Sequence, residues 1–458
     1  MAYDTQSRCG SRRARRRVTI KPRLLYRGWS TNGSLLLMSL VVMAIAERAL
    51  WAAFRDDAGA SGGEAFTVAR AIAAGRGIAD AYQPGQGPTA HLLPVSPSIA
   101  GGAYWLLGTD SIAATAPLTA WGIGCSIGSY LLLARSFRSL GAPAAACFGA
   151  VAFLCLAPTY ITQEAIDFRA WEGGLALLLG AAFLDRLAAN LDTPLRWPGA
   201  IRLAVLAALT FFVNPAFGIG VYAAGALFMW GRWPFLRLVA LGLVAAAILA
   251  AFVAPWAIRN GRVLDAPVLL RSNAGLELAL ANRPDAVDGR DQAARYFARL
   301  EEIHPHTSLA AYRRMQRAGG EVAYARALGA EARRFLAAHP AAAARLFARH
   351  IAQTFAPPAW AFDQLKQGWP GRIKAALAGL AALLGLAGLA RRVWRDGRRW
   401  LYPAAMILVP ALLMAPFQPI ARYCYLINAL SVFGAADLLW ALWINRRRKA
   451  IGNSQSGM

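Results

Sequence analysis

Four groups of acidic, basic and amide side chains lie beside long apolar runs of this sequence, where charged residues are costly unless they serve a purpose. The first is SGGEAFTVARAIAAGRG at 61–77, and the second is TQEAIDFRAWEGG at 162–174. The third extends from APWAIRN to LRSNAGLELALAN, between 254 and 282, and the fourth is the pair Arg422-Tyr423. A carboxylate near an arginine can take a proton from a hydroxyl while the arginine holds a phosphate.

Candidate catalytic acids lie in or near the first two groups: Glu64, Glu172, Asp167 and Asp57, with Asp56 next to the last. The candidates for binding a phosphate or a sugar come from the other two groups: Arg259, Asn260, Arg271, Ser272, Asn273, Arg422 and Tyr423. Each residue alone also has a structural explanation. An acid at a helix start stabilises the helix by about 0.3–1 kcal/mol. Ser272 or Asn273 suits a helix N-cap, and Arg259 suits a basic anchor at a membrane surface.

Other kinds of site are disfavoured by the sequence. His304 and His306 are spaced like possible metal ligands, but two histidines without further ligands favour loop residues. The five cysteines lie in the basic tail or in apolar runs and have no CxxC spacing. No P-loop, dinucleotide-binding, HExxH or nucleophile-elbow motif is present. We therefore predict no cofactor and no metal ligand, and the metal requirement stays open.

Composition indicates what kind of molecule must position these residues. The chain has 458 residues, of which 57% are hydrophobic and only 16% are charged. Several apolar runs approach 20 residues, which is typical of polytopic membrane proteins. The formal net charge of +25 comes largely from short basic clusters between those runs. Because no nucleic-acid-binding motif accompanies this charge, we expect it to orient membrane spans and predict no nucleic-acid partner.

The apolar runs predict an all-α polytopic protein of about ten transmembrane helices. They lie at 34–54, 112–134, 142–160, 172–190, 199–213, 214–231, 235–257, 372–390, 401–416 and 421–443. Residues 95–108 are too short to span comfortably and suit an interfacial or re-entrant segment. The resulting organisation is a basic tail (1–33), a bundle (34–257) with a first loop (55–111), a large loop (258–371), further membrane helices (372–443) and a second basic tail (444–458).

Basic clusters occur in alternate connections of this arrangement, which predicts cytoplasmic termini and two long extracytoplasmic loops. Amphipathic patterns predict juxtamembrane helices in both long loops rather than a separate β-domain. In AAAARLFARHIAQTFA, for example, Phe347, Ile351 and Phe355 recur every four residues.

In this topology, we expect all four polar groups to lie on the same extracytoplasmic surface of the membrane, at the lipid boundary. A transferase that uses a lipid-phosphate-linked donor needs this combination, with an acid to deprotonate the acceptor hydroxyl and an arginine to hold the lipid phosphate. A transporter or lipid flippase is the main alternative, but no related halves are visible, and only Glu47-Arg48 lies clearly within a span. A non-catalytic membrane scaffold is the third alternative.

The sequence also resembles a known family in the order and spacing of several segments. These are GGEAFTVARAIAAGRGIADAYQPGQGPTAHLLPVSPSIAGGAYWLLG, then APWAIRNGRVLDAPVLLRSNAGLELALANRPDA, and later GGEVAYARALGAEARRFLAAHP. They are similar to bacterial members of the C-type (GT-C) membrane glycosyltransferase superfamily, near its dolichyl-phosphate-mannose protein mannosyltransferase-like branch. The resemblance implies a helical membrane bundle, a polyprenyl-phosphate sugar donor and an inverting reaction.

The resemblance also assigns roles to residues. Glu64 matches the first-loop catalytic acid by position, although many members have aspartate there and Asp56 or Asp57 lies nearby. Glu172, or failing it Asp167, matches a second-loop acid. Arg259 and the RSNAG segment fall where relatives have polar residues near the donor. His91 replaces an expected aromatic residue, and RYCYLINAL departs from the RYR ending of relatives around Arg422.

The expected protein is thus a glycosyltransferase of a bacterial cytoplasmic membrane with an extracytoplasmic active site. Its expected partners are the lipid bilayer, a polyprenyl-phosphate-linked sugar, and an acceptor that is a glycan, a lipid or a protein.

Overall fold

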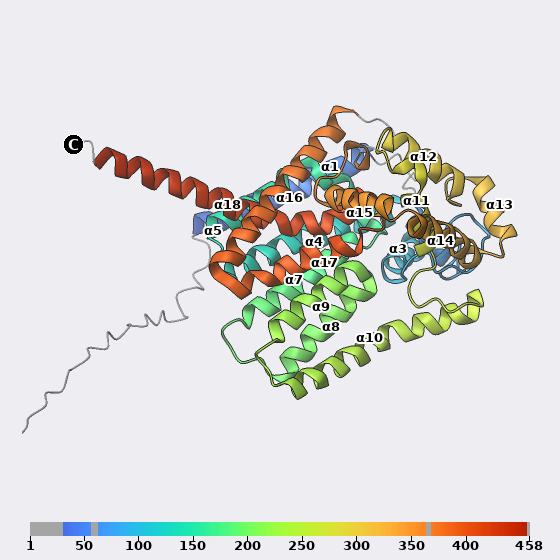
Figure 1. Ribbon diagram of the computed structural model, residues 1–458, viewed down its shortest axis with the longest axis horizontal. Coiled ribbons are helices and arrows are strands. Elements are labelled where there is room, and N and C mark those ends of the chain that lie inside the picture. Colours follow the sequence, from blue (N-terminus) through green and yellow to red (C-terminus); the bar gives the residue numbers. More distant parts are fainter. Residues whose placement is uncertain (1–30, 56–62, 363–367, 456–458) are drawn as a thin grey trace, which may run out of the picture.

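The computed structural model describes residues 31–55, 63–362 and 368–455, and within them the regular structure is helical (Figure 1). The exception is one isolated bridge between Ala79 and Pro88 in the first loop. The predicted all-α class is therefore confirmed. The candidate acids Asp56 and Asp57 lie outside the described residues.

Each of the ten predicted apolar runs contains a helix of the bundle. These helices are α1 (Thr31–Arg55), α4 (Ile112–Ser139), α5 (Ala144–Leu156), α7 (Gly173–Ala189), α8 (Trp197–Val213), α9 (Pro215–Met229), α10 (Phe235–Leu264), α16 (Trp369–Asp396), α17 (Leu401–Leu413) and α18 (Ala421–Gln455). Among the described residues, five helical stretches are long and apolar enough to cross a membrane, one of them covering α16 and α17 together. A sixth stretch counts if Ala144–Leu156 and Pro158–Arg169, which are bent by 41°, form one span. The predicted helices are present, and several are shorter than a full crossing.

Small residues allow the last membrane helices to pack closely. A Cβ atom on Gly388 of α16 would lie 2.0 Å from the carbonyl oxygen of Gly434 on α18, and one on Gly385 would lie 2.3 Å from that of Ser431. Helices that lack a side chain at a crossing can bring their backbones together, which is how helices associate in lipid. The backbones of α16 and α18 are consequently in close contact where the two helices cross.

An ion pair is buried inside the bundle. Arg48 of α1, with a side chain only 1% exposed, donates to Glu164 at 2.5 Å and to the carbonyl oxygens of Leu154 and Cys155 at 2.9 and 2.7 Å. Glu164 belongs to the short helix α6 (Ile161–Ala165) and also accepts a hydrogen bond from Tyr130 of α4. These contacts join four helices, α1, α4, α5 and α6, and they pair the buried charges, as burial requires.

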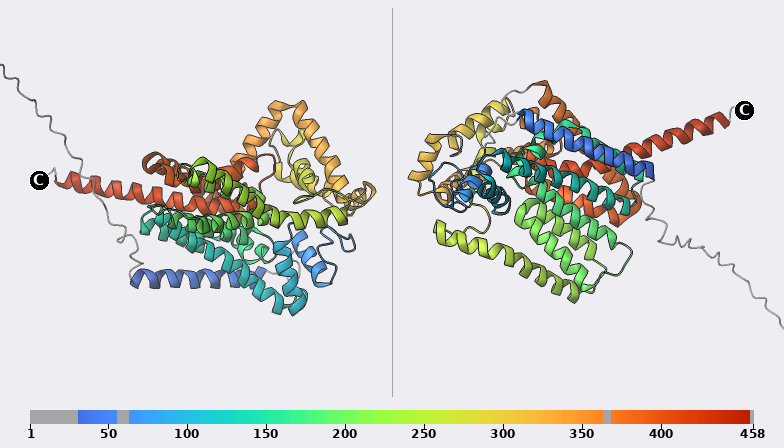
Figure 2. Two further views of the ribbon diagram at one scale, coloured as in Figure 1. Left: turned by 90° about the horizontal axis from the view of Figure 1, so that it is seen from below. Right: turned by 180° about the vertical axis from the view of Figure 1, so that it is seen from behind.

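The two long loops between membrane helices gather at one end of the bundle, called here the loop end (Figure 2). The first loop contains α2 (Glu64–Ala73) and α3 (Val95–Leu107). The large loop contains α11 (Ala274–Ala281), α12 (Gln292–Ile303), α13 (Leu309–Arg317), α14 (Glu321–Ala338) and α15 (Pro340–Phe355). The predicted helical character of both loops is confirmed, and His339-Pro340 separates α14 from α15.

Candidate functional site

Glu64 is placed by the tight start of α2. Gly63, immediately before it, has a φ of 107°, which L residues rarely adopt, and the Trp171 ring lies against its α-carbon. Glu64 then opens the first helical turn, where the helix dipole favours an acid. Phe66, Val68 and Ala69 anchor the helix in the core. The Glu64 side chain is only 12% exposed and lies next to two histidines, His91 of the first loop and His304 of the large loop.

A small hairpin of the first loop presents His91 to Glu64. The amide of Asp80 donates to the carbonyl of Gly87 at 2.9 Å, and the Asp80 carboxylate accepts from the Gly87 amide at 2.9 Å. This hairpin carries Tyr82, whose hydroxyl lies 2.9 Å from Nδ1 of His91. Nε2 of His91 lies 3.7 Å from Oε1 of Glu64. Both rings are buried, so the hairpin brings a fixed imidazole to the acid.

Arg259 holds this hairpin in place. Its guanidinium donates to the carbonyl oxygens of Ile78 and Thr89, both at 2.6 Å, and thereby ties the end of α10 to the base of the hairpin. The neighbouring Asn260 is buried and donates to the carbonyl of Val268 at 3.0 Å. Among the described residues, both predicted binding residues therefore have structural partners of their own.

Glu321 of α14 holds the hairpin from the other side. Its carboxylate accepts from the Thr89 hydroxyl at 2.6 Å, from the Ala90 amide at 2.7 Å and from the Ser272 hydroxyl at 2.9 Å. The hydroxyl of Ser272, a predicted binding residue, thus already donates its hydrogen bond to Glu321. Asn273 takes the N-cap position of α11, as predicted, but its side chain makes no capping hydrogen bond and donates instead to Glu277 at 3.2 Å.

His304 meets Glu64 from the large loop. It follows the last residue of α12, so the predicted loop position is correct, but the ring is buried and its Nε2 lies 3.3 Å from Oε1 of Glu64. Burial lowers the pKa of His304 to about 4, and the neighbouring Glu64 carboxylate only partly offsets this effect. Burial also raises the pKa of Glu64, but His91 and His304 outweigh it and hold that pKa well below the ordinary value.

Two arginines lie beside this cluster with donor groups left over. Arg271 donates to Glu172 at 2.7 Å, and Arg422 places its guanidinium 3.7 Å from the centre of the Trp171 ring. In both arginines Nε is buried and has no hydrogen-bond partner among the described residues. Buried donors of this kind are normally satisfied, so an unpaired pair of them indicates a place for an anion.

Glu277 completes the polar group; it lies in the third group of the sequence analysis, which assigned it no role. It lies on α11 close enough to His91, Glu64 and Arg422 for their charges to interact. Burial raises the pKa of Glu277, and the nearby cations only partly offset this rise. Two neighbouring acids therefore have pKa values displaced in opposite directions, an arrangement typical of acid–base sites.

The structure thus brings several predicted residues together and separates others. Glu64, Glu172, Asp167, Arg422, Arg271 and Tyr423 interact electrostatically at the loop end. Arg259, Asn260 and Ser272 support the surrounding backbone instead. The sequence analysis missed His91, His304 and Glu277 as members of the site; the available signal was the unusual histidine after GPTA and the close pair His304 and His306.

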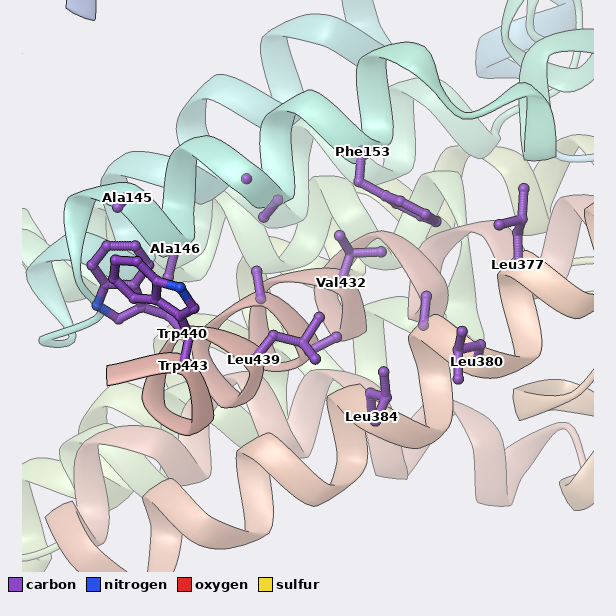
Figure 3. A pocket seen from close by; sticks show the side chains of 15 residues that line it. Ala145, Ala146, Phe153, Leu377, Leu380, Leu384, Val432, Leu439, Trp440 and Trp443 are labelled. Atoms are coloured by element: carbon purple, nitrogen blue, oxygen red, sulfur yellow. The ribbon is translucent and has the colours of Figure 1, made fainter. Parts of the chain in front are cut away.

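An apolar groove lies at the opposite end of the bundle from these polar groups. It has a volume of about 520 Å³ and is lined by α5, α16 and α18, including Phe153, Leu380, Trp440 and Trp443 (Figure 3). Trp440 follows Arg422 by several turns of α18, roughly 27 Å along the helix. The groove is therefore separate from the site, and its apolar lining faces the region where lipid chains pack.

Comparisons with known proteins identify the fold. The sequence matches no protein-family model and no curated protein. The structure is similar to that of the archaeal oligosaccharyltransferase AglB from Archaeoglobus fulgidus in its apo form, with 14% identity, a TM-score of 0.52, and coverage of 92% of this chain and 52% of that one. AglB in complex with an inhibitory peptide and a dolichol-phosphate gives 14% identity, a TM-score of 0.50, and coverage of 93% and 52%.

This chain therefore spans about half the length of AglB and shares its fold over that part. The fold implied by the sequence resemblance is confirmed as one shared with AglB, and membership of the superfamily and of its branch stays a prediction. The chain is a multi-pass membrane protein.

Proposed function

We propose that this protein is a membrane glycosyltransferase that moves a sugar from a polyprenyl-phosphate-linked donor to an acceptor hydroxyl. The observation that carries the proposal is the loop-end cluster, in which two arginines with unpaired buried Nε groups lie among several carboxylates. On a GT-C fold, this cluster has both an anion-binding side and an acid–base side. The acceptor is a glycan, a lipid or a protein.

The donor phosphate is assigned to Arg422 and Arg271. Each has an N–H group without a partner, and Trp171 beneath Arg422 holds the guanidinium plane in one orientation. The arginines would bind the donor and stabilise the charge that the departing phosphate gains. AglB, which shares the fold, has a known structure in complex with a dolichol-phosphate, a ligand of the same chemical class as the proposed product.

We assign the role of the base, which accepts the proton of the acceptor hydroxyl, to a carboxylate of the cluster. Glu64 of the first loop is the first candidate and Glu277 is the second. As the acceptor oxygen forms a bond to the anomeric carbon, the bond from that carbon to the phosphate oxygen breaks. The carboxylate takes the hydroxyl proton, and polyprenyl phosphate leaves with the electron pair. Attack from the face opposite the phosphate inverts the anomeric configuration.

We place the loop end outside a bacterial cytoplasmic membrane. The connections at the opposite end of the bundle carry Arg138, Arg196, Arg232 and Arg398, whereas the loop end has the long polar segments. Positive residues favour the cytoplasmic side, so both tails would lie inside the cell.

The proposal is tested by transfer from labelled undecaprenyl-phosphate sugars, both hexoses and pentoses, in membranes from a strain that expresses the protein. We expect transfer with wild type, and loss of it with Glu64→Gln or Glu277→Gln, whichever is the base. Glu331→Gln, at an exposed position of α14, is the control and should keep the activity. A mass difference in envelope glycans or glycoproteins between a deletion strain and its parent should accompany activity. No transfer from any donor, together with unchanged glycans, would leave a transporter, flippase or scaffold role and refute the proposal.

A further inference from the structure

We propose that Glu64, His91 and His304 form a binding site for one divalent transition-metal ion, with zinc as the preferred metal. Oε1 of Glu64 lies 3.3 Å from Nε2 of His304 and 3.7 Å from Nε2 of His91. One possible ligand atom from each residue lies within 4.8 Å of the other two. The three residues come from α2, from the hairpin after it and from the turn after α12, so only the folded chain assembles them.

The distances suit ligands of a common ion better than direct hydrogen bonds. Zinc–nitrogen and zinc–oxygen bonds of about 2.0–2.1 Å at tetrahedral angles place ligand atoms about 3.3–3.4 Å apart. Hydrogen bonds between nitrogen and oxygen are typically about 2.7–3.2 Å. The separation of Glu64 and His91 is too long for a good hydrogen bond, and that of Glu64 and His304 equals a tetrahedral edge. A small inward movement of His91 would complete the geometry.

The ligand types select the metal. Two imidazoles and one carboxylate favour zinc, cobalt or nickel, whereas magnesium and calcium prefer sites made of oxygen atoms. Three protein ligands also leave a fourth tetrahedral position for water or a substrate oxygen, which is the composition of zinc sites that do chemistry.

Neighbouring groups orient the imidazoles. The Tyr82 oxygen lies 2.9 Å from Nδ1 of His91 and can accept its proton, which leaves Nε2 free to bind a metal. The Tyr82 ring contacts both imidazoles edge-on, with centroid distances of 4.8 and 5.7 Å. Nδ1 of His304 accepts from the His306 amide at 3.3 Å, so metal binding would move the proton of His304 from Nε2 to Nδ1 and give up that one bond.

A metal here would deepen the proposed function, and this part of the inference rests on it. The ion would supply positive charge beside the arginines that face the donor phosphate. Glu64 would then be a ligand, which leaves Glu277 as the carboxylate that accepts the proton. Metal binding itself does not depend on the proposed activity.

The test measures metal in the full-length protein, purified with a tag that contains no histidine. Elemental analysis should find about one zinc per wild-type chain, which His91→Ala and His304→Ala lose. His339→Ala, an exposed histidine between α14 and α15, should keep it. After chelation, micromolar Zn²⁺ should raise the unfolding temperature of wild type and His339→Ala, and millimolar Mg²⁺ should not. Co²⁺ added to chelated wild type should give the intense visible absorption of a four-coordinate site.

The outcomes separate this inference from the proposed function. Zinc in wild type but not in the cluster variants, without any sugar transfer, supports the metal site and contradicts the transferase. Transfer by wild-type protein that holds no zinc and gives no Co²⁺ spectrum overturns the metal site and leaves the transferase. Zinc retained by His91→Ala and His304→Ala places the metal elsewhere and also overturns the inference. The Co²⁺ spectrum of wild type decides the matter even if a variant does not fold.

Discussion

Arg422 combines two properties that suit it to an anion. Its guanidinium is stacked 3.7 Å from the centre of the Trp171 ring, which restricts its orientation, and its Nε has no partner among the described residues. The nearby acids Glu64, Glu172 and Asp167 interact electrostatically with Arg422. Within the described part of the chain, none of them forms a salt bridge to it. An anion would therefore find an oriented donor whose charge is not already neutralised by a direct partner.

We expect Arg422→Ala to weaken the binding of undecaprenyl phosphate by roughly 10- to 150-fold. This corresponds to the loss of about 1.5–3 kcal/mol for a hydrogen bond to a charged group. Calorimetric titration of the purified protein measures the affinity. Arg326→Ala, which removes an exposed arginine of α14, should leave it unchanged. Equal affinity in Arg422→Ala and wild type would take Arg422 out of the phosphate site.

A second residue-level prediction concerns the buried pair Arg48 and Glu164. Arg48→Met leaves the carboxylate of Glu164 buried without its main partner, which typically costs about 3–5 kcal/mol. The double variant Arg48→Met with Glu164→Leu removes both charges and should recover most of the stability. Thermal unfolding in detergent, followed by tryptophan fluorescence, compares the two. A double variant no more stable than the single one would contradict this explanation.

Single residues were predictable from the sequence only where their neighbours along the chain gave a signal. Glu64, Arg271 and Arg422 stand beside apolar runs, and their cost in that setting makes them candidates. Glu277 looks like any acid in the first turn of a helix, and His304 like any loop histidine. Their place in the site depends on contacts between the first and the large loop, which no local pattern encodes.

At the scale of elements, the site depends on a hairpin that has almost no secondary structure of its own. One isolated bridge and the Asp80–Gly87 bonds close it, while Arg259 and Glu321 hold it from α10 and α14. Helical periodicity predicted the helices around it correctly. Helical periodicity could not predict the hairpin, because the hairpin is held by hydrogen bonds from the Arg259 side chain to carbonyl groups far away in the sequence.

We expect Arg259→Ala to loosen this hairpin without unfolding the bundle. The change removes two charge-assisted hydrogen bonds, each worth about 1.5–3 kcal/mol. Hydrogen–deuterium exchange of peptides covering 76–92 should become faster, and peptides of α16 and α18 should not change. Arg262→Ala, an exposed position one turn later on α10, serves as the comparison. Unchanged exchange at the hairpin would show that Arg259 is not its clamp.

At the scale of the whole molecule, the long loops collect at one end of the bundle (Figure 1), and the basic connections lie at the other. The alternation of apolar and basic segments predicted this division. It also predicted the short helices α8 and α9, which have 17 and 15 residues, but it did not predict the bend after α5. Composition records that a segment is apolar, but neighbouring helices decide how much of it is exposed to lipid.

The orientation of the molecule is testable with introduced cysteines. The described native cysteines are buried, and Cys9, which lies outside the described residues, is replaced by serine as a precaution. A membrane-impermeant maleimide should label Glu331→Cys, at the loop end, in intact spheroplasts. It should label Thr193→Cys, between α7 and α8, only after lysis. The reverse pattern would place the site in the cytoplasm.

The hydrogen bonds from the hairpin to Glu321 also determine the stage of synthesis at which the contacts of the loop end can be completed. Glu321 emerges from the ribosome 232 residues after Thr89. At about 5–20 residues per second, the delay is roughly 10–50 s. Throughout that interval the Thr89 hydroxyl and the Ala90 amide lack the Glu321 carboxylate as an acceptor. The nascent chain thus makes its early helices first, and the contacts of its loop end are complete only once α14 has been made.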